Sequence, residues 1–236
     1  GESFTGRILS WIEFLIKLYF FKFTPASKPG IVFVSSMSLL PVLYATHLRK
    51  RLKIPFVLEI RDIWPLTAIE IGGFSRLNPF IWAFQRFEKY AYKSADAIIS
   101  LMPDFKAHLE TTIKEPRPVY WIPNAIERGL EVNILNSRTS SGVFTIAYAG
   151  ALGNANAMEC FIKAADLLQD EEIAFLIIGD GPEKSTLKRL ANHNPKVKFI
   201  DKVPKNEVLS MLSNVDAGFI SWHDLGLYNY GVSANK

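Results

Sequence analysis

The sequence lacks most of the motifs that mark common enzyme classes. Its 236 residues include one cysteine, Cys160, so no disulfide can form within the chain, and a reducing compartment suits it. The four histidines lie far apart, and none stands at a metal-ligand spacing from Cys, His or a carboxylate. GxSxG, GxxxxGK[ST] and Asp-x-Asp motifs are all absent. The sequence therefore predicts no metal site, and Cys160 is expected to be a small buried residue on a helix.

No stretch is apolar enough to be predicted as a membrane-spanning helix. Residues 7–23 read RILSWIEFLIKLYFFKF, but Glu13, Lys17 and Lys22 interrupt the run, and a spanning helix needs about 20 mostly apolar residues. The cleavage pattern of a signal peptide is also absent. Two interpretations stay open for this helix, namely burial against a sheet and a position in a membrane interface.

The charge is unevenly distributed along the chain. Residues 1–128 hold 17 Lys and Arg against 11 Asp and Glu, a balance of +6, whereas residues 129–236 hold 10 against 12, a balance of −2. A basic half indicates an anionic partner such as lipid headgroups, nucleic acid or phosphorylated small molecules. The sequence starts without a methionine and ends just after a predicted loop, so we expect it to be a piece of a longer protein.

The clearest pattern lies in residues 144–182. An apolar run ends in Gly150, a short loop with Gly153 follows, a segment with helical apolar spacing comes next, and a second apolar run ends in Gly179-Asp180-Gly181-Pro182. Strand, glycine loop, helix and strand in this order form one βαβ unit. Ligands of parallel sheets lie beyond the carboxyl ends of the strands, so the two glycine loops are the predicted ligand sites.

The first glycine loop is an incomplete dinucleotide fingerprint. Residues 150–153 lack the middle glycine of GxGxxG, although glycines still let the backbone come close and the next helix points its N–H groups at an anion. Asn154 or Asn156 could cap that helix. Asp180 could reach the ribose of a dinucleotide, or residues 179–182 could form a turn against which a flat base lies.

The first half alternates strands with helices, as a doubly wound α/β sheet does. Strands are predicted over residues 31–34, 55–60, 95–100 and 118–122, and helices over 39–52, 78–92 and 103–112, with Ser35 to Ser38 capping the first of these helices. Residues 125–142 lose periodicity and predict a linker. In the second half, strands are expected over 144–149, 173–178, 197–200 and 215–220, with a polar and aromatic loop after residue 220.

Two segments of the first half have both a structural and a functional interpretation. Arg61 and Asp62 follow a predicted buried strand, where they could belong to a site or form a structural ion pair. Residues 74–92 are aromatic, basic and amphipathic, which fits an ordinary core-facing helix or a surface that meets anionic lipid.

Taken together, these residues resemble family 4 glycosyltransferases of the GT-B fold, in particular the bacterial enzymes that build O-antigen, capsule and related surface sugars. The matching stretches are LEIRDIWP (58–65), FEKYAYKSADAIISLMPDFKAHL (87–109), YWIPNAIE (120–127), FTIAYAGALGNANAMECFIKAADLL (144–168), AFLIIGDGPEKSTLKRLA (174–191), VKFIDKVPKNEVLSMLSNVDAGFI (197–220) and GVSANK (231–236). The resemblance implies an α/β protein with two Rossmann-like, doubly wound domains facing a cleft, truncated at both ends. Residues 1–128 would bind the acceptor and lack a first strand, residues 129–142 would be the linker, and residues 143–236 would be an incomplete nucleotide-sugar domain.

The resemblance also implies a retaining transfer from a nucleotide-diphosphate sugar, usually UDP-linked, without a metal or other cofactor. Arg61 and Asp62 would face the reaction centre, and Ser36, Trp64, Trp82 and Arg86 would lie on the acceptor or membrane side. The nucleotide-sugar site would comprise Gly150, Gly153, Asn154, Gly179, Asp180, Gly181, Pro182, Val203, Pro204 and Lys236. The chain departs from the family in residues 151–157, which lack the Arg and Lys of many relatives, and the family's paired glutamates would lie beyond residue 236.

We therefore expect an enzyme at the cytoplasmic face of the inner membrane that passes a sugar to a lipid-linked acceptor, such as a polyprenyl-diphosphate sugar. The leaving diphosphate would be stabilised by N–H groups, a helix dipole and a lysine, and front-face attack would let it take the acceptor proton. One alternative is a non-catalytic, GT-B-shaped binding module at the membrane. Another is an NAD-dependent oxidoreductase or epimerase, which the missing middle glycine disfavours, and nucleic acid is not an expected partner.

Overall fold

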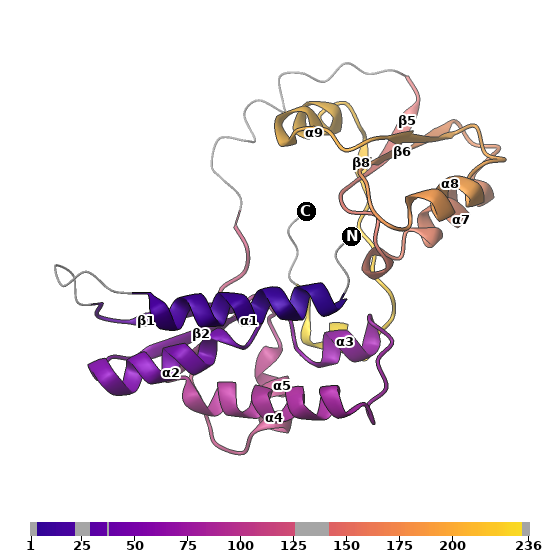
Figure 1. The fold of residues 1–236 in the computed structure, drawn as a ribbon. Coiled ribbons are helices and arrows are strands. Elements are labelled where there is room, and N and C mark those ends of the chain that lie inside the picture. Colours follow the sequence, from indigo (N-terminus) through magenta and orange to yellow (C-terminus); the bar gives the residue numbers. More distant parts are fainter. Residues whose placement is uncertain (1–3, 22–28, 37, 126–141, 233–236) are drawn as a thin grey trace. The chain divides into compact units, whose positions relative to one another are not determined.

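The computed structural model describes residues 4–21, 29–36, 38–125 and 142–232. Its contacts divide the chain into two compact units (Figure 1). Unit 1 comprises Gly1–Asn124 and Leu225–Asn235, and unit 2 comprises Ala125–Asp224 together with Lys236. The sequence analysis placed residues 225–232 in the second domain, whereas the contacts of the structure place them in unit 1. The predicted linker lies almost wholly outside the described residues.

Unit 1 is built on a four-stranded parallel sheet. Its strands follow the order β1 (Val32–Ser36), β2 (Phe56–Ile60), β3 (Ala97–Ser100) and β4 (Val119–Trp121). Val32 of β1 lies opposite Phe56 of β2, and Val57 of β2 lies opposite Ala97 of β3. Because all strands run the same way, the residues that follow β1 and β2 lie at one edge of the sheet, which is where a parallel sheet binds ligands.

The helices of unit 1 begin at residues that suit helix starts. They are α1 (Phe4–Phe20), α2 (Pro41–Leu52), α3 (Leu66–Glu70), α4 (Pro79–Ser94) and α5 (Phe105–Thr112). Asn78 caps α4 by accepting the N–H of Phe80 at 2.9 Å, and Pro79 occupies the first turn as predicted. The predicted serine cap of α2 is wrong, because Ser36 ends β1 and Leu40 takes the cap position without a side-chain hydrogen bond.

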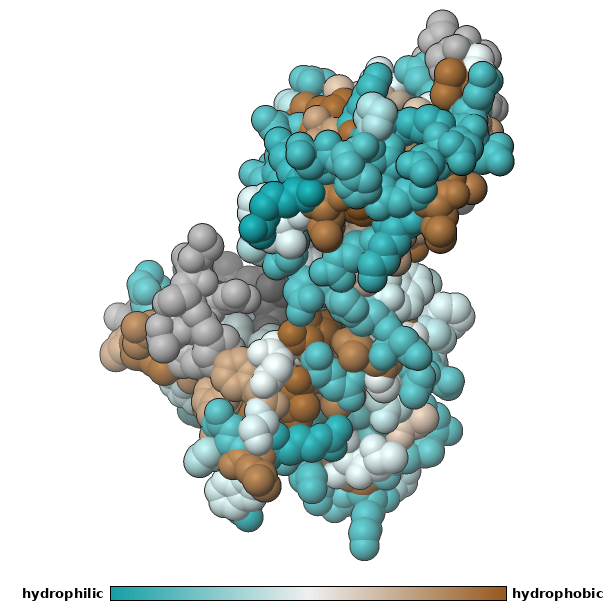
Figure 2. Space-filling view, turned by 90° about the vertical axis from the view of Figure 1, so that its right-hand side faces the viewer, coloured by the Kyte–Doolittle hydropathy of each residue, from teal (hydrophilic) through white to brown (hydrophobic). Residues whose placement is uncertain are grey.

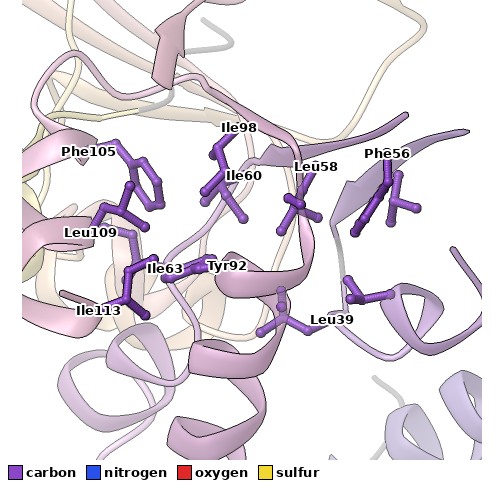
Figure 3. Packing of buried hydrophobic residues seen from close by; sticks show 14 of the residues in the cluster. Leu39, Phe56, Leu58, Ile60, Ile63, Tyr92, Ile98, Phe105, Leu109 and Ile113 are labelled. Carbon is purple, nitrogen blue, oxygen red and sulfur yellow. The ribbon is translucent and has the colours of Figure 1, made fainter. Parts of the chain in front are cut away.

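The core of unit 1 lies between the sheet and its helices. Leu58, Ile60 and Ile98 from the strands meet Tyr92 of α4 and residues of α5 (Figure 3). The alternating burial of β2 and β3 places one face of each strand in this core.

The beginning of β2 is fastened by an aspartate that precedes β3. The Asp96 carboxylate accepts the Phe56 N–H at 2.9 Å, and the Asp96 N–H donates to the Phe56 carbonyl at 2.8 Å. Arg49 of α2 adds two further hydrogen bonds, one of them from Nε at 2.8 Å. The side-chain hydrogen bond from Arg49 lowers the pKa of Asp96.

A short helix from the end of the chain completes unit 1. This helix, η2 (Gly226–Tyr230), lies in the stretch that the sequence predicted as a loop. Leu227 is buried in the core of unit 1, and its N–H donates to the Glu70 carboxylate at 2.6 Å. The Asp104 N–H donates to the Tyr230 carbonyl at 3.0 Å. These bonds explain why the segment belongs to unit 1.

Unit 2 is a second four-stranded parallel sheet in the order β7-β6-β5-β8. The strands are β5 (Phe144–Ala149), β6 (Ile173–Ile178), β7 (Val197–Ile200) and β8 (Ala217–Gly218), and the helices are η1 (Asn154–Asn156), α7 (Glu159–Leu167), α8 (Lys184–Leu190) and α9 (Lys205–Leu212). Helices α7 and α8 pack together, with α9 on the opposite side of the sheet (Figure 1). The predicted βαβ unit is therefore β5, α7 and β6.

One expectation about a side chain and one about membranes can be compared with this fold. Cys160 is exposed on α7, so its predicted burial is wrong, because the apolar stripe of α7 runs through Phe161, Ile162 and Ala165 instead. No helix in the described ranges combines the length and hydropathy needed to cross a membrane.

Candidate active site

The two glycine loops of unit 2 lie side by side at the carboxyl ends of β5 and β6. The Gly150 N–H donates to the Ile178 carbonyl at 2.9 Å, and the Leu152 N–H donates to the Asp180 carbonyl at 2.9 Å. The Glu183 N–H in turn donates to the Leu152 carbonyl at 3.0 Å. These hydrogen bonds hold the backbones of residues 150–153 and 179–183 against each other.

The glycines of the second loop are required by this close approach. A Cβ at Gly179 would lie 1.9 Å from the Gly150 carbonyl oxygen, and one at Gly181 would lie 2.3 Å from the Leu152 carbonyl oxygen. The space beside these glycines is thus filled by the neighbouring loop. At Gly153, by contrast, the nearest atom to a Cβ would be Asn156 Nδ2 at 4.0 Å, so this position is open.

The asparagines of the first loop do not cap α7. Asn154 to Asn156 form the short helix η1, and Met158 takes the cap position of α7 without a side-chain hydrogen bond. The predicted cap is therefore wrong. Asn156 Nδ2 instead donates to the Ala151 carbonyl at 3.0 Å, and the buried Tyr148 hydroxyl donates to the same oxygen at 2.7 Å. Burial raises the pKa of Tyr148 to about 12, so this hydroxyl keeps its proton as a donor.

Acidic groups flank the first loop. A small hollow of about 10 Å³ is lined by Gly153, Glu159, Glu183 and His223 among other residues. Glu159 stands in the first turn of α7, where the positive end of the helix dipole stabilises its carboxylate. Two carboxylates at this hollow weaken its attraction for an anion, and residues 151–157 supply no Arg or Lys.

Lys184, the first residue of α8, is a charged group next to the second loop that the sequence analysis missed. Its Nζ donates to the Gly179 carbonyl at 3.0 Å and to Asp201 at 2.6 Å, and it lies 3.6 Å from Asp180. The hydrogen bond to Asp201 is the main cause that raises the pKa of Lys184, and the same bond lowers the pKa of Asp201. The spacing of four between Asp180 and Lys184 was a signal for this pair.

The remaining predicted nucleotide residues surround these loops. Asp180 and Pro182 are exposed, and Asp180 accepts the Gly181 N–H at 2.9 Å. Val203 and Pro204 follow β7 and lead into α9. They therefore stand at the carboxyl end of the strand next to β6, while Lys236 lies outside the described residues.

In unit 1, three of the predicted residues follow β2. Arg61 and Asp62 come directly after Ile60, and Trp64 packs edge-on against Trp11 of α1 with ring centroids 5.8 Å apart. The pKa of Asp62 is raised because the surrounding protein desolvates the carboxylate, although part of its surface stays open, and the charge of Arg61 opposes the shift. Asp62 also contributes to the raised pKa of Tyr228, after burial as the larger cause, so η2 lies close to Asp62.

The other acceptor-side predictions fall on different surfaces of unit 1. Ser36 ends β1 opposite Ile60 of β2, so it shares the sheet edge with Arg61 and Asp62. Trp82 is exposed on α4, and Arg86 stacks over its ring with the guanidinium carbon 3.9 Å from the centroid. The structure thus gathers the residues at the ends of β1 and β2 and leaves the α4 pair as a separate surface feature.

A polar pocket of unit 1 was not predicted from the sequence. It has a volume of about 500 Å³ and lies between α3, α4, α5 and η2. At its floor, the buried Glu88 carboxylate meets His108 Nε2 at 2.7 Å and the Tyr92 hydroxyl at 3.0 Å. The two cations that also line it, Arg76 and Lys89, form no ion pair with any described residue. Its side chains come from segments far apart in sequence, so spacing could not reveal them.

The comparisons with known proteins agree with this geometry. Residues 143–224 match the family described as "Glycosyl transferases group 1". A curated Pseudomonas aeruginosa protein named "Probable glycosyltransferase WbjE" is 23% identical over 225 residues, which cover 91% of this chain and 56% of that protein. The chain therefore spans little more than half the length of this relative.

Solved structures show the same fold at low sequence identity. The lipopolysaccharide outer core galactosyltransferase WaaB has a TM-score of 0.53 at 17% identity, covering 93% of this chain and 56% of that one. WaaG, a glycosyltransferase involved in lipopolysaccharide biosynthesis, has a TM-score of 0.57 at 15% identity, covering 78% and 57%. Anabaena HepE, solved in complex with UDP and glucose, has a TM-score of 0.53 at 12% identity, covering 92% and 57%. The predicted resemblance is thus confirmed: residues 143–224 match the model of group 1 glycosyltransferases, and the chain has the α/β fold of GT-B enzymes.

Proposed function

We propose that the chain belongs to a retaining glycosyltransferase that moves a sugar from a nucleotide-diphosphate sugar, UDP-linked, to a lipid-linked glycan in bacterial surface polysaccharide synthesis. The observation that carries the proposal is the pair of glycine loops within the matched domain. The atom nearest to the position of a Cβ at Gly153 is Asn156 Nδ2 at 4.0 Å, so this position leaves room for an anion beside the backbone. HepE, which shares the fold, has been solved with UDP and glucose, and this supports UDP as the nucleotide.

The transfer needs a stabilised leaving group and an oriented acceptor. A nucleoside diphosphate gains negative charge as the glycosidic bond breaks, and backbone N–H groups at Gly153 with the positive end of α7 oppose that charge. The leaving phosphate takes the proton of the attacking hydroxyl in a front-face reaction, so no separate base is needed. Arg61 adds positive charge on the acceptor side. Asp62, whose pKa is raised, accepts a hydrogen bond from the acceptor when it is ionised.

Binding of UDP in the presence of EDTA tests the donor site and the absence of a metal together. Isothermal titration of the purified chain with UDP, GDP and NAD is expected to show binding of UDP alone, because the base and diphosphate meet backbone of unit 2. NAD binding would favour an oxidoreductase instead. Absence of any nucleotide binding would favour the non-catalytic module, which the acidic lining at Glu159 and Glu183 supports.

We further propose that unit 1 docks on the cytoplasmic face of the inner membrane through α1. Leu9, Ile16 and Phe20 of α1 are 67%, 52% and 81% exposed, while Trp11 on the other side of the helix packs against Trp64. Figure 2 shows hydrophobic residues at the surface of unit 1 among hydrophilic ones. An apolar helix face on a unit with surplus Lys and Arg is typical of an interfacial helix.

Sedimentation with anionic vesicles at low salt tests this surface. The wild-type chain is expected in the pellet, and the double substitution Ile16→Ser with Phe20→Ser is expected to move it to the supernatant, since each removes exposed apolar area without opening the core. Leu167→Ser is the matched control, because Leu167 is 87% exposed in unit 2. A wild-type chain that stays in the supernatant, or equal loss with the control, contradicts the proposal.

A further inference from the structure

A segment that follows β8 reaches back to the first glycine loop. The Ser221 hydroxyl donates to the Asn156 carbonyl at 2.6 Å, and His223 Nε2 lies 2.6 Å from the Asn154 carbonyl oxygen. These partners are 65 and 69 residues apart in sequence. A carbonyl oxygen only accepts, so His223 must carry a proton on Nε2 to make this bond. The bonds therefore tie the loop to a distant part of unit 2.

The carbonyl groups of the loop are almost all occupied by donors from the protein. Ala151 accepts from Tyr148 and Asn156. The carbonyls of Leu152 and Gly153 accept backbone N–H groups at 3.0 Å each. With Asn154 and Asn156 held as above, these oxygens are engaged by the protein. The partial negative charges of these carbonyl oxygens therefore face protein donors and do not face an anion bound at the loop.

The N–H groups of the same loop are less occupied. In the described part of the chain, the amides of Gly153, Met158 and Glu159 donate to no backbone or side-chain acceptor. Gly153 has no atom closer than 4.0 Å to the position of a Cβ, and His223 lines the same small hollow. A loop with engaged carbonyls and available amides has the polarity that a phosphate needs.

We propose that His223 is a positioning residue for the diphosphate of the donor, with Ser221 in a supporting role. The inference rests on the proposed function, because the diphosphate is that of the nucleotide sugar. His223 holds the Asn154 carbonyl turned toward itself, and this fixes η1 so that the Gly153 amide faces the ligand. The Ala157 N–H also donates to the Asn154 carbonyl at 3.3 Å, so loss of the imidazole weakens the hold on η1 and on the loop beside the phosphates. The role does not require His223 to touch the diphosphate.

The experiment measures UDP affinity by isothermal titration in EDTA for the wild type and a small set of variants. His223→Ala is expected to weaken UDP binding about tenfold, the ratio that corresponds to about 1.4 kcal/mol and to one hydrogen bond lost from a loop. His223→Gln keeps a side-chain N–H that can reach the Asn154 carbonyl, so it is expected to restore most of the affinity. Ser221→Ala is expected to weaken binding about threefold, because a neutral hydroxyl bond contributes less.

His193→Ala is the matched control, because His193 is an exposed histidine of the same unit that pairs with Asp166 at 3.2 Å, away from the loop. It is expected to bind UDP as the wild type does. The melting temperature without ligand is expected to be the same for all variants, since the bond orders a surface loop and no core group.

Two results would overturn the role of His223. One is wild-type affinity in His223→Ala. The other is a lowered melting temperature without ligand in both His223→Ala and His223→Gln, with no rescue of UDP binding, which would make the histidine a general structural residue. A wild-type chain that binds no UDP would instead remove the proposed function, and with it the basis of this inference.

Discussion

Unit 1 and unit 2 hold the beginnings of their central strands in the same way, yet they differ where those strands end. Asp96 in unit 1 and Asp216 in unit 2 each precede a strand and clamp the neighbouring one. Asp216 accepts the Thr145 N–H at 2.9 Å and donates its own N–H to the Thr145 carbonyl at 2.9 Å, as Asp96 does with Phe56. The sequences around them, SADA and NVDA, differ, so the geometry repeats with little sequence in common.

The two sheets differ at the edge where their strands end. In unit 2, glycines follow β5 and β6, and the backbones of these two loops pack against one another. In unit 1 the corresponding position after β2 carries Arg61, Asp62 and Trp64, which are long or charged side chains. In parallel sheets of this kind, the arrangement of the strands sets where a ligand lies, whereas the residues at the strand ends decide whether backbone or side chains meet it.

The largest expected effect concerns the glycines that only unit 2 has at its strand ends. Gly179→Ala and Gly181→Ala are each expected to lower the free energy of unfolding of unit 2 by about 3 kcal/mol or more, because a Cβ at 1.9 or 2.3 Å from a backbone oxygen forces the loops apart. Thermal unfolding measures the loss. Gly153→Ala serves as the control and should unfold like the wild type; an equal loss there would show that the contact distances do not govern stability.

The next largest effect on stability is expected at Asp96 and Asp216, the aspartates that hold the starts of β2 and β5. Asp96→Ala is expected to cost about 2 kcal/mol, and Asp216→Ala about 1 kcal/mol, because Asp96 also receives the Arg49 hydrogen bonds. Chemical denaturation with hydrogen exchange at the Phe56 and Thr145 amides measures each cost in its own unit. Asp104→Ala, which removes an exposed carboxylate without a side-chain cap bond, should change neither; an equal cost for both clamps would remove the distinction between the units.

The pH dependence of the Asp96 clamp has a definite sign. Its pKa is lowered in the folded protein, so the unfolded chain binds the proton more readily and folding is favoured while the carboxylate is ionised. The contribution is expected to be fully present above about pH 5 and to disappear as the pH falls through the lowered pKa, below about 4. A difference between wild type and Asp96→Ala that stays constant down to pH 2 would contradict this account.

A smaller effect concerns the acidic lining that distinguishes the unit 2 loop. Glu159→Gln is expected to tighten UDP binding two- to threefold, about 0.5 kcal/mol, since it removes a partly screened negative charge from the first turn of α7. Titration calorimetry measures the change. Glu172→Gln removes an exposed carboxylate of the same unit outside the loops. Equal tightening in both variants would point to net charge alone.

The smallest effect is expected at the charged strand end of unit 1. The raised pKa of Asp62 means that the folded protein holds the proton more tightly than the unfolded chain, so stability declines as the pH rises through the folded pKa. Asp62→Asn is expected to stabilise the protein at pH 7 by about 0.5 kcal/mol, a small value because the side chain keeps open surface. The gain should vanish below about pH 4 in denaturant titrations, and a loss of stability at pH 7 would show that the ionised carboxylate is favourable there.

Most strands and helices could be predicted because their residues carry local signals. β2 and β6 are short apolar runs, and α4 begins at an Asn-Pro pair, so both the strand bounds and the helix start agree with the structure. The cap of α7 could not be predicted, because Asn156 bonds backwards to Ala151 rather than forwards to the helix. Local composition does not distinguish these two partners.

The candidate site was predictable only where it consists of backbone. The glycine loops are visible as sequence patterns, but the contacts of His223 and Ser221 depend on residues more than 60 positions away, and η2 docks on unit 1 through Leu227 and Glu70. Such contacts arise from topology, since β8 lies beside β5 in the sheet. A single sequence holds no spacing that reveals them.

The return of the chain to unit 1 has a consequence for synthesis on the ribosome. Residues 1–124 emerge first, but Leu227, which closes their core at 5% exposure, is translated only after the whole of unit 2. In nascent unit 1, the apolar site of Leu227 next to Glu70 and the start of α5 therefore stays uncovered while about 100 further residues are made. Synthesis proceeds at roughly 5–20 residues per second. That interval of seconds is the period in which the growing chain is most exposed to chaperones and to aggregation.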